Sequence, residues 1–292
     1  MNSHGKGESM DIICVLENRK SVRNYKKKVL PENLLEKIIH LATVSRPLYQ
    51  DIQIKFIPIL DGAKASKKLS GFAGYFGKTI EAPHYIAVIT DKKEGYLENL
   101  GYCMEQLMLE AYKEELGTCW IEVLHYESKL KEAFGVFEPD KIMLALTPIG
   151  YPKETAIDKL TGRFLEEKSV RKSVDEIVFF QKWGKQTEGR DLSKYLEILD
   201  IARWAPSWGN QQPWQFIIDE NKVVLAVMKE KNNAINRNRI DGGIIMLYFE
   251  WIARQKNIFG TWSKAEKRME EYYRIPEKFE LLSVFKENSV YR

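Results

Sequence analysis

Long apolar runs, cysteine, histidine and a strong charge of one sign are all scarce in this chain of 292 residues. No apolar run reaches the roughly eighteen residues that a membrane span needs, and the opening MNSHGKGESMD has no signal-peptide core. The 45 basic and 41 acidic residues leave a net charge of +4, and the KKK run at 26–28 is too short for a nucleic-acid-binding face. The sequence therefore predicts a cytoplasmic protein that binds neither nucleic acid nor a membrane.

Three cysteines and four histidines offer little metal or redox chemistry. Cys14, Cys103 and Cys119 lie far apart without a CxxC pair, so neither a disulfide framework nor a thiolate metal site is predicted. We expect buried, reduced thiols. The histidines lack the spacing of metal ligands. No strand is followed by GxGxxG or GxxxxGK[ST], which leaves a dinucleotide fingerprint or a P-loop without support.

Three pairs of segments recur in the same order, which predicts an internal duplication. LEKIIHLATVSRPLYQDIQIKFI (35–57) overlays YLEILDIARWAPSWGNQQPWQFI (195–217) without a gap. GYCMEQLMLEAYKEELGTCW (101–120) matches IIMLYFEWIARQKNIFGTW (244–262), and EPDKIMLAL (138–146) matches IPEKFELLS (275–283). We assign residues 11–178 to a first repeat and 179–292 to a second, shortened repeat, intertwined as one globular unit.

Hydrophobic periodicity predicts the same kinds of element in both repeats. In the first repeat we expect a short helix ending near Asn18, helices at 31–42 and 97–116, and strands at 52–59, 84–90 and 142–149, with Gly117 as the cap of the second long helix. The polar linker 153–190 contains the island EIVFF, which we expect to pack as an arm. The second repeat is predicted to have helices at 192–204, 241–259 and 263–273, and strands at 214–218, 261–262 and 279–285.

Three motifs carry a family resemblance. RKSVRNY (19–25), GTCWIE (117–122) and APSWGNQQPWQF (205–216) together resemble the nitroreductase family of FMN enzymes. The resemblance implies an α+β fold with three α/β/α layers and a mostly antiparallel central sheet. In the family the PSxxNxQPW motif follows the RRSxR motif within one subunit, whereas here it occurs only in the second repeat. Arg46, Pro47, Leu48, Tyr49 and Gln50 take its place in the first.

This split has a consequence for assembly. Family members are homodimers whose two flavin sites lie at the subunit interface, so the resemblance implies a fused pseudo-dimer with an internal two-fold axis. Because only one repeat keeps each motif, we expect one intact FMN site per chain and a monomer where relatives are dimers.

The resemblance also assigns the cofactor-binding residues. Arg19, Lys20 and Ser21 match phosphate and ribityl contacts, and Arg171 and Lys172 match a basic pair that follows the GYP element at 150–152. Arg23 and Lys78 match cations near the pyrimidine edge of the ring, although for Lys78 a solvated surface role is equally open. Tyr75 stands where relatives often hold Asn or Gln. Backbone groups of Trp120, Ile121 and Glu122 would run along the ring, and Pro206, Ser207, Trp208 and Asn210 would approach it from the second repeat.

The function implied is FMN-dependent oxidoreduction without a catalytic side chain, because hydride moves between stacked rings. NAD(P)H would reduce the flavin and leave before a small-molecule acceptor, such as a nitroaromatic or a quinone, reoxidises it. Trp208 replaces a residue that is usually small, so it either stacks on the substrate or fills part of the pocket. In the second case the chain would be a flavin-binding module without turnover. Other flavin chemistry, such as reductive dehalogenation or flavin cleavage, is a further alternative.

Overall fold

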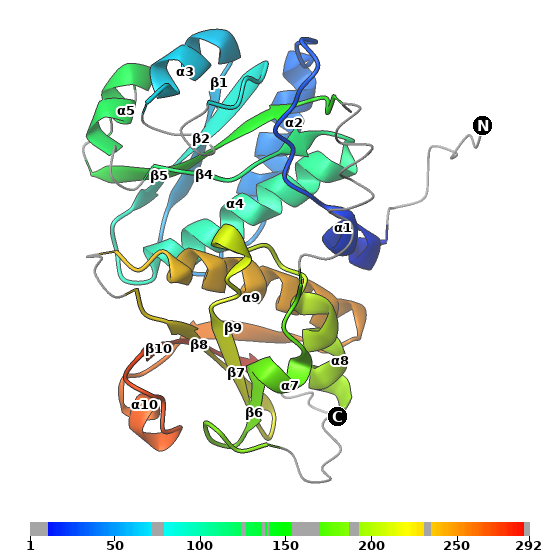
Figure 1. The fold of residues 1–292 in the computed structure, drawn as a ribbon, viewed down its shortest axis with the longest axis vertical. Helices are drawn as coiled ribbons and strands as arrows, with labels where there is room; N and C mark the ends of the chain where they lie inside the picture. The colour runs from blue at the N-terminus through cyan, green and yellow to red at the C-terminus, as the bar shows by residue number, and fades with distance from the viewer. Residues whose placement is uncertain are drawn as a thin grey trace, which may run out of the picture.

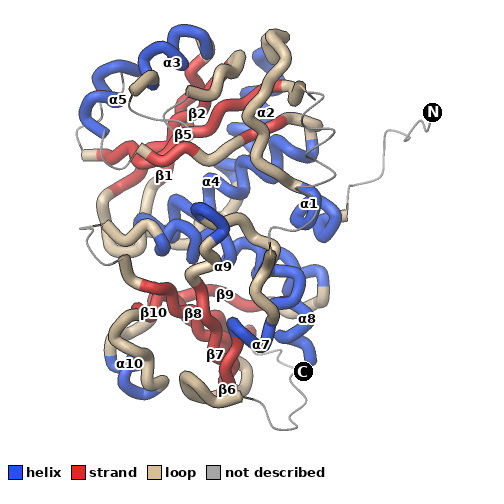
Figure 2. Tube along the Cα trace, in the orientation of Figure 1, coloured by secondary structure: helices blue, strands red, loops and turns tan. Residues whose placement is uncertain are grey.

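Two mainly antiparallel sheets lie at opposite ends of the molecule, with long helices between them (Figure 1). The computed structural model describes residues 11–71, 79–123, 127–135, 138, 140–153, 170–186, 193–230 and 235–288. Figure 2 shows the arrangement as two red sheets separated by blue helices. None of the helices in these ranges is long and apolar enough to cross a membrane.

The two sheets have the same strand order. The first runs β1-β2-β5-β3, with β4 also paired to β5, and is antiparallel throughout. The second runs β7-β8-β10-β9 and carries β6 as an additional edge strand. The strands are β1 Ile54–Ile59, β2 His84–Asp91, β3 Gly117–Thr118, β4 Ile121–Glu122, β5 Lys141–Gly150, β6 Val178–Phe180, β7 Trp214–Asp219, β8 Lys222–Met228, β9 Gly260–Lys264 and β10 Phe279–Glu287. The repeated order confirms the internal duplication.

The arm predicted from the EIVFF island is also confirmed. After the short helix α7 (Val174–Ile177), β6 runs parallel to β7, with Val178 opposite Phe216 and Phe180 opposite Ile218. Val178 and Phe180 are buried. The segment that follows the first half therefore adds an edge strand to the sheet of the second half.

Helices cover both faces of each sheet. The remaining helices are α1 Ile12–Asn18, α2 Glu32–Val44, α3 Gly62–Leu69, α4 Tyr96–Lys113, α5 Glu127–Phe134, α8 Ser193–Ala202, the 3-10 helix η1 Trp208–Asn210, α9 Asn238–Gln255 and α10 Arg268–Tyr272. Because side chains alternate along a strand, Ile86 and Val88 of β2 enter the central core, while Ala87 and Ile89 face an outer cluster under α3. A smaller outer cluster lies between α10 and the second sheet. Each half therefore has the three predicted layers.

Helices α4 and α9 cross at the centre of the molecule through two glycines. A Cβ atom at Gly101 would lie 2.1 Å from the carbonyl oxygen of Ile240, and one at Gly243 would lie 2.0 Å from that of Glu98. Real Cβ contacts are never this short, so glycine is required at both positions. The two contacts are reciprocal, because Gly101 and Gly243 occupy the same place in equivalent helices, as do Glu98 and Ile240. This reciprocity is the mark of an internal two-fold axis.

A β-bulge marks the same point in both sheets and fixes the equivalence of the strands. The β2–β5 register breaks after the Val88–Ala145 pair, and the β8–β10 register breaks after the Leu225–Ser283 pair. Ala145 is therefore equivalent to Ser283, one residue away from the partner that the sequence overlay gives it.

The bulge also fixes which residues of β4 and β9 are equivalent. Glu122 pairs with Ala145 and Lys264 pairs with Ser283, so Glu122 is equivalent to Lys264 and Trp120 to Trp262. The tryptophans of GTCW and GTW are thus correctly matched, whereas their Gly-Thr pairs lie one residue out of register.

Two details of the element prediction are wrong. Helix α4 ends at Lys113, and the left-handed residue that follows it is Glu115, with φ of 59°. Gly117 lies in β3, where a Cβ would meet the side chain of Val22 at 2.7 Å. The helix expected at 263–273 is confined to α10, because β9 continues to Lys264. Helices α3 and α5 and strand β8 were not predicted.

The thiols differ from expectation at one position. Cys103 and Cys119 are buried, as expected, but Cys14 is exposed on α1. Burial raises the pKa of the Cys103 thiol to about 12, despite a hydrogen bond to the backbone of Leu48 that acts the other way. Cys103 is therefore a neutral core residue, packed among apolar neighbours between the two sheets.

Candidate functional site

Arg19, the first residue after α1, lies buried between the two halves. Helix α1 packs against both α4 and α9, and the Arg19 side chain that follows it is only 5% exposed. Its Nε lies 3.0 Å from Oε1 of Glu105, a fully buried residue of α4. Glu105 also accepts hydrogen bonds from Tyr248 Oη of α9 at 3.2 Å and from Trp120 Nε1 at 2.7 Å. Residues from both halves thus form one polar cluster.

The charges of this cluster follow from its burial. Burial alone lowers the pKa of Arg19, but the negative charge of Glu105 and a hydrogen bond with Tyr248 raise it further than burial lowers it. Burial and Glu105 together raise the pKa of Tyr248. Arg19 is therefore a cation and Tyr248 a neutral donor at neutral pH. Within the described part of the chain, Arg19 Nη1 has no hydrogen-bond acceptor.

Arg171 is a second guanidinium, half-buried and within electrostatic reach of the first. Its Nη1 donates to Asn210 Oδ1, and its Nη2 donates to the carbonyl of Trp204 at 3.0 Å. Its buried Nε has no acceptor among the described residues. Burial lowers the pKa of Arg171, Tyr248 opposes this, and Arg19 lowers the pKa further, so the two guanidinium groups are within electrostatic reach of one another. No carboxylate of the described residues is among the groups that shift Arg171.

The loop after α8 is held in place by its own polar side chains. Ser207 Oγ accepts from the Gln212 N–H at 2.9 Å, and Asn210 Nδ2 donates to the Val170 carbonyl at 3.2 Å. Gly209 and Asn210 are both left-handed, with φ of 56°, a conformation that Gly and Asn adopt most readily. Pro206 precedes this turn. Residues 205–210 thus form a tight loop between the helix expected at 192–204 and the strand expected at 214–218.

The basic pair and this loop are joined directly. The Lys172 N–H donates to Gln212 Oε1 at 2.8 Å, and Lys172 Nζ donates to the Gln212 carbonyl at 2.8 Å. Together with the Arg171–Asn210 contact, these bonds bring Arg171, Lys172, Ser207 and Asn210 into one group. The Arg19 cluster adjoins it through Tyr248. The segment that begins at Arg19 and the loop at 206–210 therefore lie near each other, joined through Arg171.

The segment after Arg19 runs along the edge of the first sheet. The Val22 N–H donates to the Thr118 carbonyl at 2.8 Å, and Ser21 forms a parallel bridge with Thr118. Ser21 and Arg23 both act on Cys119, whose pKa burial raises and these two groups lower. Lys20 and Arg23 are exposed.

The remaining predicted residues lie in three different situations. The side chain of Ile121 is buried in the outer cluster of the first sheet, and its backbone pairs with Leu146. The backbone of Glu122 pairs with Ala145. Tyr75 and Lys78 lie outside the described residues.

Sequence reasoning missed Glu105, Tyr248 and Asp241. The Asp241 carboxylate accepts from the Trp208 N–H at 3.2 and 3.3 Å. Glu105 interrupts the apolar face of a helix that is otherwise buried, and Asp241 is a buried acid near the start of α9. Charged residues at such positions are a signal in sequence, because an acid is rarely buried without partners. Their partners, however, come from distant segments and could not be named.

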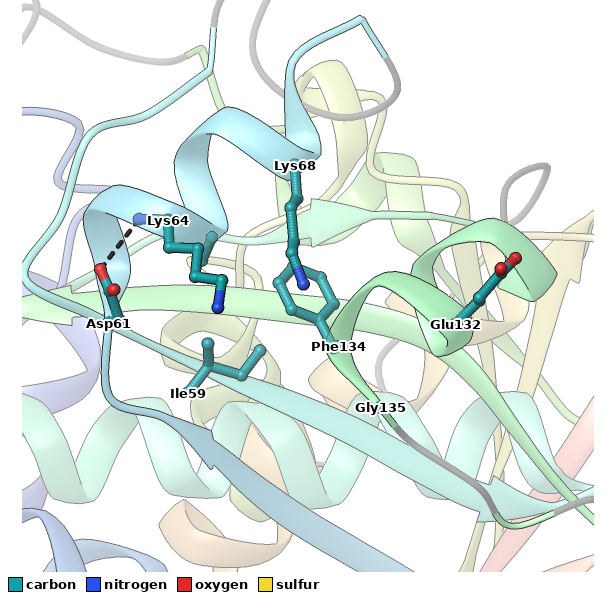
Figure 3. Close-up of a pocket in the computed structure, with 8 residues that line it drawn as sticks. Ile59, Asp61, Lys64, Lys68, Glu132, Phe134 and Gly135 are labelled. Carbon is teal, nitrogen blue, oxygen red and sulfur yellow. Dashed lines mark hydrogen bonds between the residues drawn. The ribbon is translucent and has the colours of Figure 1, made fainter.

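A separate cavity lies on the outer side of the first sheet, between α3 and α5 (Figure 3). Its volume is about 390 Å³, and its lining is Ile59, Asp61, Lys64, Ala65, Lys68, Glu132, Phe134 and Gly135. None of the motif residues lines it. It is an open surface cleft whose lysines lie on one helix, and it takes no part in the site described above.

Comparison with known proteins agrees with this geometry. The model of the family described as "Putative TM nitroreductase" matches residues 11–253. This chain belongs to that nitroreductase family. A crystal structure titled as a "putative nitroreductase" from Thermotoga maritima aligns over 97% of this chain and 96% of its own, with a TM-score of 0.59 and 18% identity. The whole fold is therefore shared, including both halves.

A curated relative from Methanothermobacter thermautotrophicus, named "Putative NADH dehydrogenase/NAD(P)H nitroreductase", is 25% identical over 157 residues. The match covers 51% of this chain and 82% of the relative. A relative of ordinary subunit size thus corresponds to about half of the nitroreductase chain described here, as a tandem duplication requires.

Proposed function

We propose that the protein binds one FMN where Arg19 and Arg171 meet the 206–210 loop, and that it is an FMN-dependent oxidoreductase. The observation that carries this proposal is a pair of guanidinium groups, Arg19 buried and Arg171 half-buried, with buried N–H donors that lack acceptors among the described residues. Glu105 supplies a counter-charge to Arg19, but no carboxylate of the described residues is among the groups that act on Arg171. A cation that is removed from water without a counter-charge is costly unless a bound anion supplies one. A phosphate dianion fits, because planar guanidinium forks bind its oxygens through charge-assisted hydrogen bonds.

Each group of residues would hold a different part of the cofactor. Arg19, Arg171 and Lys172, with Lys20 and Ser21, would hold the phosphate and ribityl chain, and Arg23 and Lys78 would lie near the pyrimidine edge. The backbone of Trp120–Glu122 and the loop residues Pro206, Ser207, Trp208 and Asn210, with Tyr75, would flank the ring. Bound FMN would supply hydride acceptance and donation. The protein's own groups bind and orient it, and a cation near the ring favours its reduced, anionic form.

The conformation of residues 46–50, the equivalent loop of the first half, supports a single FMN site per chain. The Tyr49 N–H donates to Asn99 Oδ1 at 3.0 Å, as the Trp208 N–H donates to Asp241, and Asn99 and Asp241 are equivalent positions of α4 and α9. The two loops therefore attach to their helices in the same way, with Tyr49 in the place of Trp208, although the gap-free overlay of 35–57 on 195–217 sets Leu48 opposite Trp208. Their aromatic side chains differ, because Tyr49 is 6% exposed and Trp208 is 50% exposed.

Tyr49 spans the gap in which a second ring would lie. Its hydroxyl is 2.5 Å from Ser283 Oγ of β10, and Lys264 Nζ of β9 is 5.0 Å from the centre of its ring. Ser283 and Lys264 are the equivalents of Ala145 and Glu122. Glu122 is one of the residues proposed to flank the FMN ring, and Ala145 is its partner in the strand ladder. Tyr49 thus fills the second position with the protein's own side chain.

The polar cluster is equally one-sided. Glu105 and Tyr248 are equivalent to Leu247 and Gln106, so the position equivalent to Glu105 carries no carboxylate, and the buried carboxylate of α9, Glu250, contacts Tyr102 and Arg254 from a different position. Trp262, the equivalent of Trp120, donates instead to the carbonyl of Met246 at 3.2 Å. We infer that the second side became a structural interface, and that the repeats 11–178 and 179–292 work as a fused monomer.

The reaction that this site supports is ping-pong electron transfer from NAD(P)H to a small acceptor such as a nitroaromatic or a quinone. The printed name of the Methanothermobacter relative includes NAD(P)H nitroreductase, which supports this class of donor. No side chain of the chain is required as acid or base. Its residues position the ring, exclude water from one side and supply positive charge.

Flavin stoichiometry tests the proposal most directly. After loading with FMN and removal of the excess, absorbance against protein mass should give about one FMN per chain. A value near two contradicts closure by Tyr49, and no binding under any loading condition contradicts the flavin proposal. Arg171→Gln should weaken FMN binding at least about tenfold, the value of one charge-assisted bond, and should leave riboflavin binding nearly unchanged. Arg268→Gln, an exposed arginine paired with Glu266, is the matched control.

A further inference from the structure

Trp208 is an exposed indole on a loop that is otherwise tightly held. Half of its surface is open to solvent, whereas Trp214, six residues later, is completely buried. A large aromatic side chain left in water forgoes the free energy of burial. Exposed aromatic residues in a fixed position are a feature of binding sites rather than of protein interiors.

The orientation of the indole is set from two sides. The Trp208 N–H is held by Asp241, and the Trp208 carbonyl accepts from the Gln211 N–H at 3.1 Å. The guanidinium of Arg237 lies over one face of the ring, 4.3 Å from its centre, and Glu230 fixes Arg237 through a 2.6 Å ion pair. One face of the ring is therefore covered by a cation from the start of α9.

The exposure is not imposed by the loop. The equivalent loop of the first half is attached to its helix by the same kind of bond, yet its aromatic residue, Tyr49, turns inward and is buried. The outward position of Trp208 is thus a property of this half alone. It is also the half that keeps Asn210 in contact with Arg171.

We propose that Trp208, backed by Arg237, is the stacking platform that selects planar, electron-poor aromatic acceptors. This inference rests on the proposed function, because it needs FMN to bind next to the loop. Asn210, two residues after Trp208, contacts Arg171, which we propose to bind the FMN phosphate. Electron-poor rings such as naphthoquinones and nitroarenes stack well on the electron-rich indole face. A preorganised ring loses little conformational freedom on binding, so affinity rises without a deep pocket.

Direct binding of a redox-inert probe tests the platform independently of turnover. Calorimetry with 2-naphthamide should show binding about tenfold weaker in Trp208→Ala, because an aromatic pair contributes up to about that factor. Trp208→Phe should retain most of the affinity. Tyr272→Ala removes a side chain that is equally exposed, at 57%, on the remote helix α10, and should change nothing. Equal affinity in Trp208→Ala and the parent protein overturns the proposal.

Reoxidation of the NADH-reduced protein gives a second, discriminating readout. The second-order rate constant with menadione should fall about tenfold in Trp208→Ala, while that with ferricyanide, which is not aromatic, should change less than about twofold. An equal fall with both acceptors overturns the platform. Failure of the parent protein to bind flavin would instead refute the proposed function, and the naphthamide titration would still decide the role of Trp208.

Discussion

The hydroxyl of Tyr248 donates to Oε1 of Glu105 across the internal two-fold axis, at 3.2 Å. The same oxygen lies 3.0 Å from Arg19 Nε, so one carboxylate joins α4, α9 and the segment after α1. Because the equivalent residues are Leu247 and Gln106, this connection has no counterpart at the equivalent positions. Glu250 of α9, which accepts from Tyr102 of α4 at 3.1 Å and pairs with Arg254, makes a similar contact at a different place on the two helices. The duplication therefore preserved the symmetry of the backbone but not the positions of the charged groups.

Replacement of Glu105 should expose how much the fold depends on this connection. Glu105→Gln leaves the buried guanidinium of Arg19 without its counter-charge, and we expect the free energy of unfolding of the flavin-free protein to fall by about 3 kcal/mol. Glu110→Gln, which removes a partly exposed ion pair with Lys113 on the same helix, should cost less than about 1 kcal/mol. Urea unfolding measures both. Equal losses in the two variants would contradict the role assigned to Glu105.

If Tyr49 fills the second flavin position through its contact with Ser283, substitutions of these two residues should have coupled effects on stability. Tyr49→Phe and Ser283→Ala each remove the buried hydroxyl contact, and each should lower the free energy of unfolding by about 1 to 2 kcal/mol. The double variant should lose clearly less than the sum, because both changes break one interaction. FMN stoichiometry should stay at about one throughout. Additive losses would show that the two hydroxyls do not depend on each other.

His84 gives the fold a defined dependence on pH. Its Nε2 accepts from the Leu30 N–H at 3.0 Å, and its Nδ1 contacts the Leu60 carbonyl at 2.8 Å. Burial lowers the pKa of His84 below its ordinary 6.5, against the weaker effect of the Leu60 carbonyl. The unfolded chain then binds the proton more readily, so the free energy of unfolding should decrease as pH falls below about 6.5.

An NMR titration of His84 and unfolding at pH 7.5 and 5.5 test this expectation. In His84→Gln the corresponding part of the pH dependence should be absent, whereas the exposed His40 is the control whose replacement should leave it intact. A His84 pKa at or above 6.5 in the folded protein would rule out the mechanism.

Local patterns predicted most of the helices and the arm, because each depends on neighbouring residues. The β8 strand, KVVLAVM, was missed because a short, continuous apolar run carries no periodicity of its own. The Arg19–Glu105 and Tyr49–Ser283 contacts join residues far apart in the chain, and only the fold could pair them. Sequence also could not show that Tyr49 faces inward and Trp208 outward, since both loops attach to their helices through similar bonds.

Substitutions at the crossing of α4 and α9 test whether the two reciprocal glycine contacts fix the distance between the helices. Gly101→Ala and Gly243→Ala each drive a methyl group into a backbone carbonyl of the other helix, and overpacking against a backbone cannot be relieved by a rotamer change. We expect both variants to lose at least about 3 kcal/mol in free energy of unfolding. Gly242→Ala is the matched control in the same helix, because its methyl group would meet the end of the Leu282 side chain, 2.5 Å away, which can move aside. A loss at Gly243 no larger than that at Gly242 would mean that the helices can separate slightly at the axis, and that the reciprocal contacts do not fix the distance between the two halves.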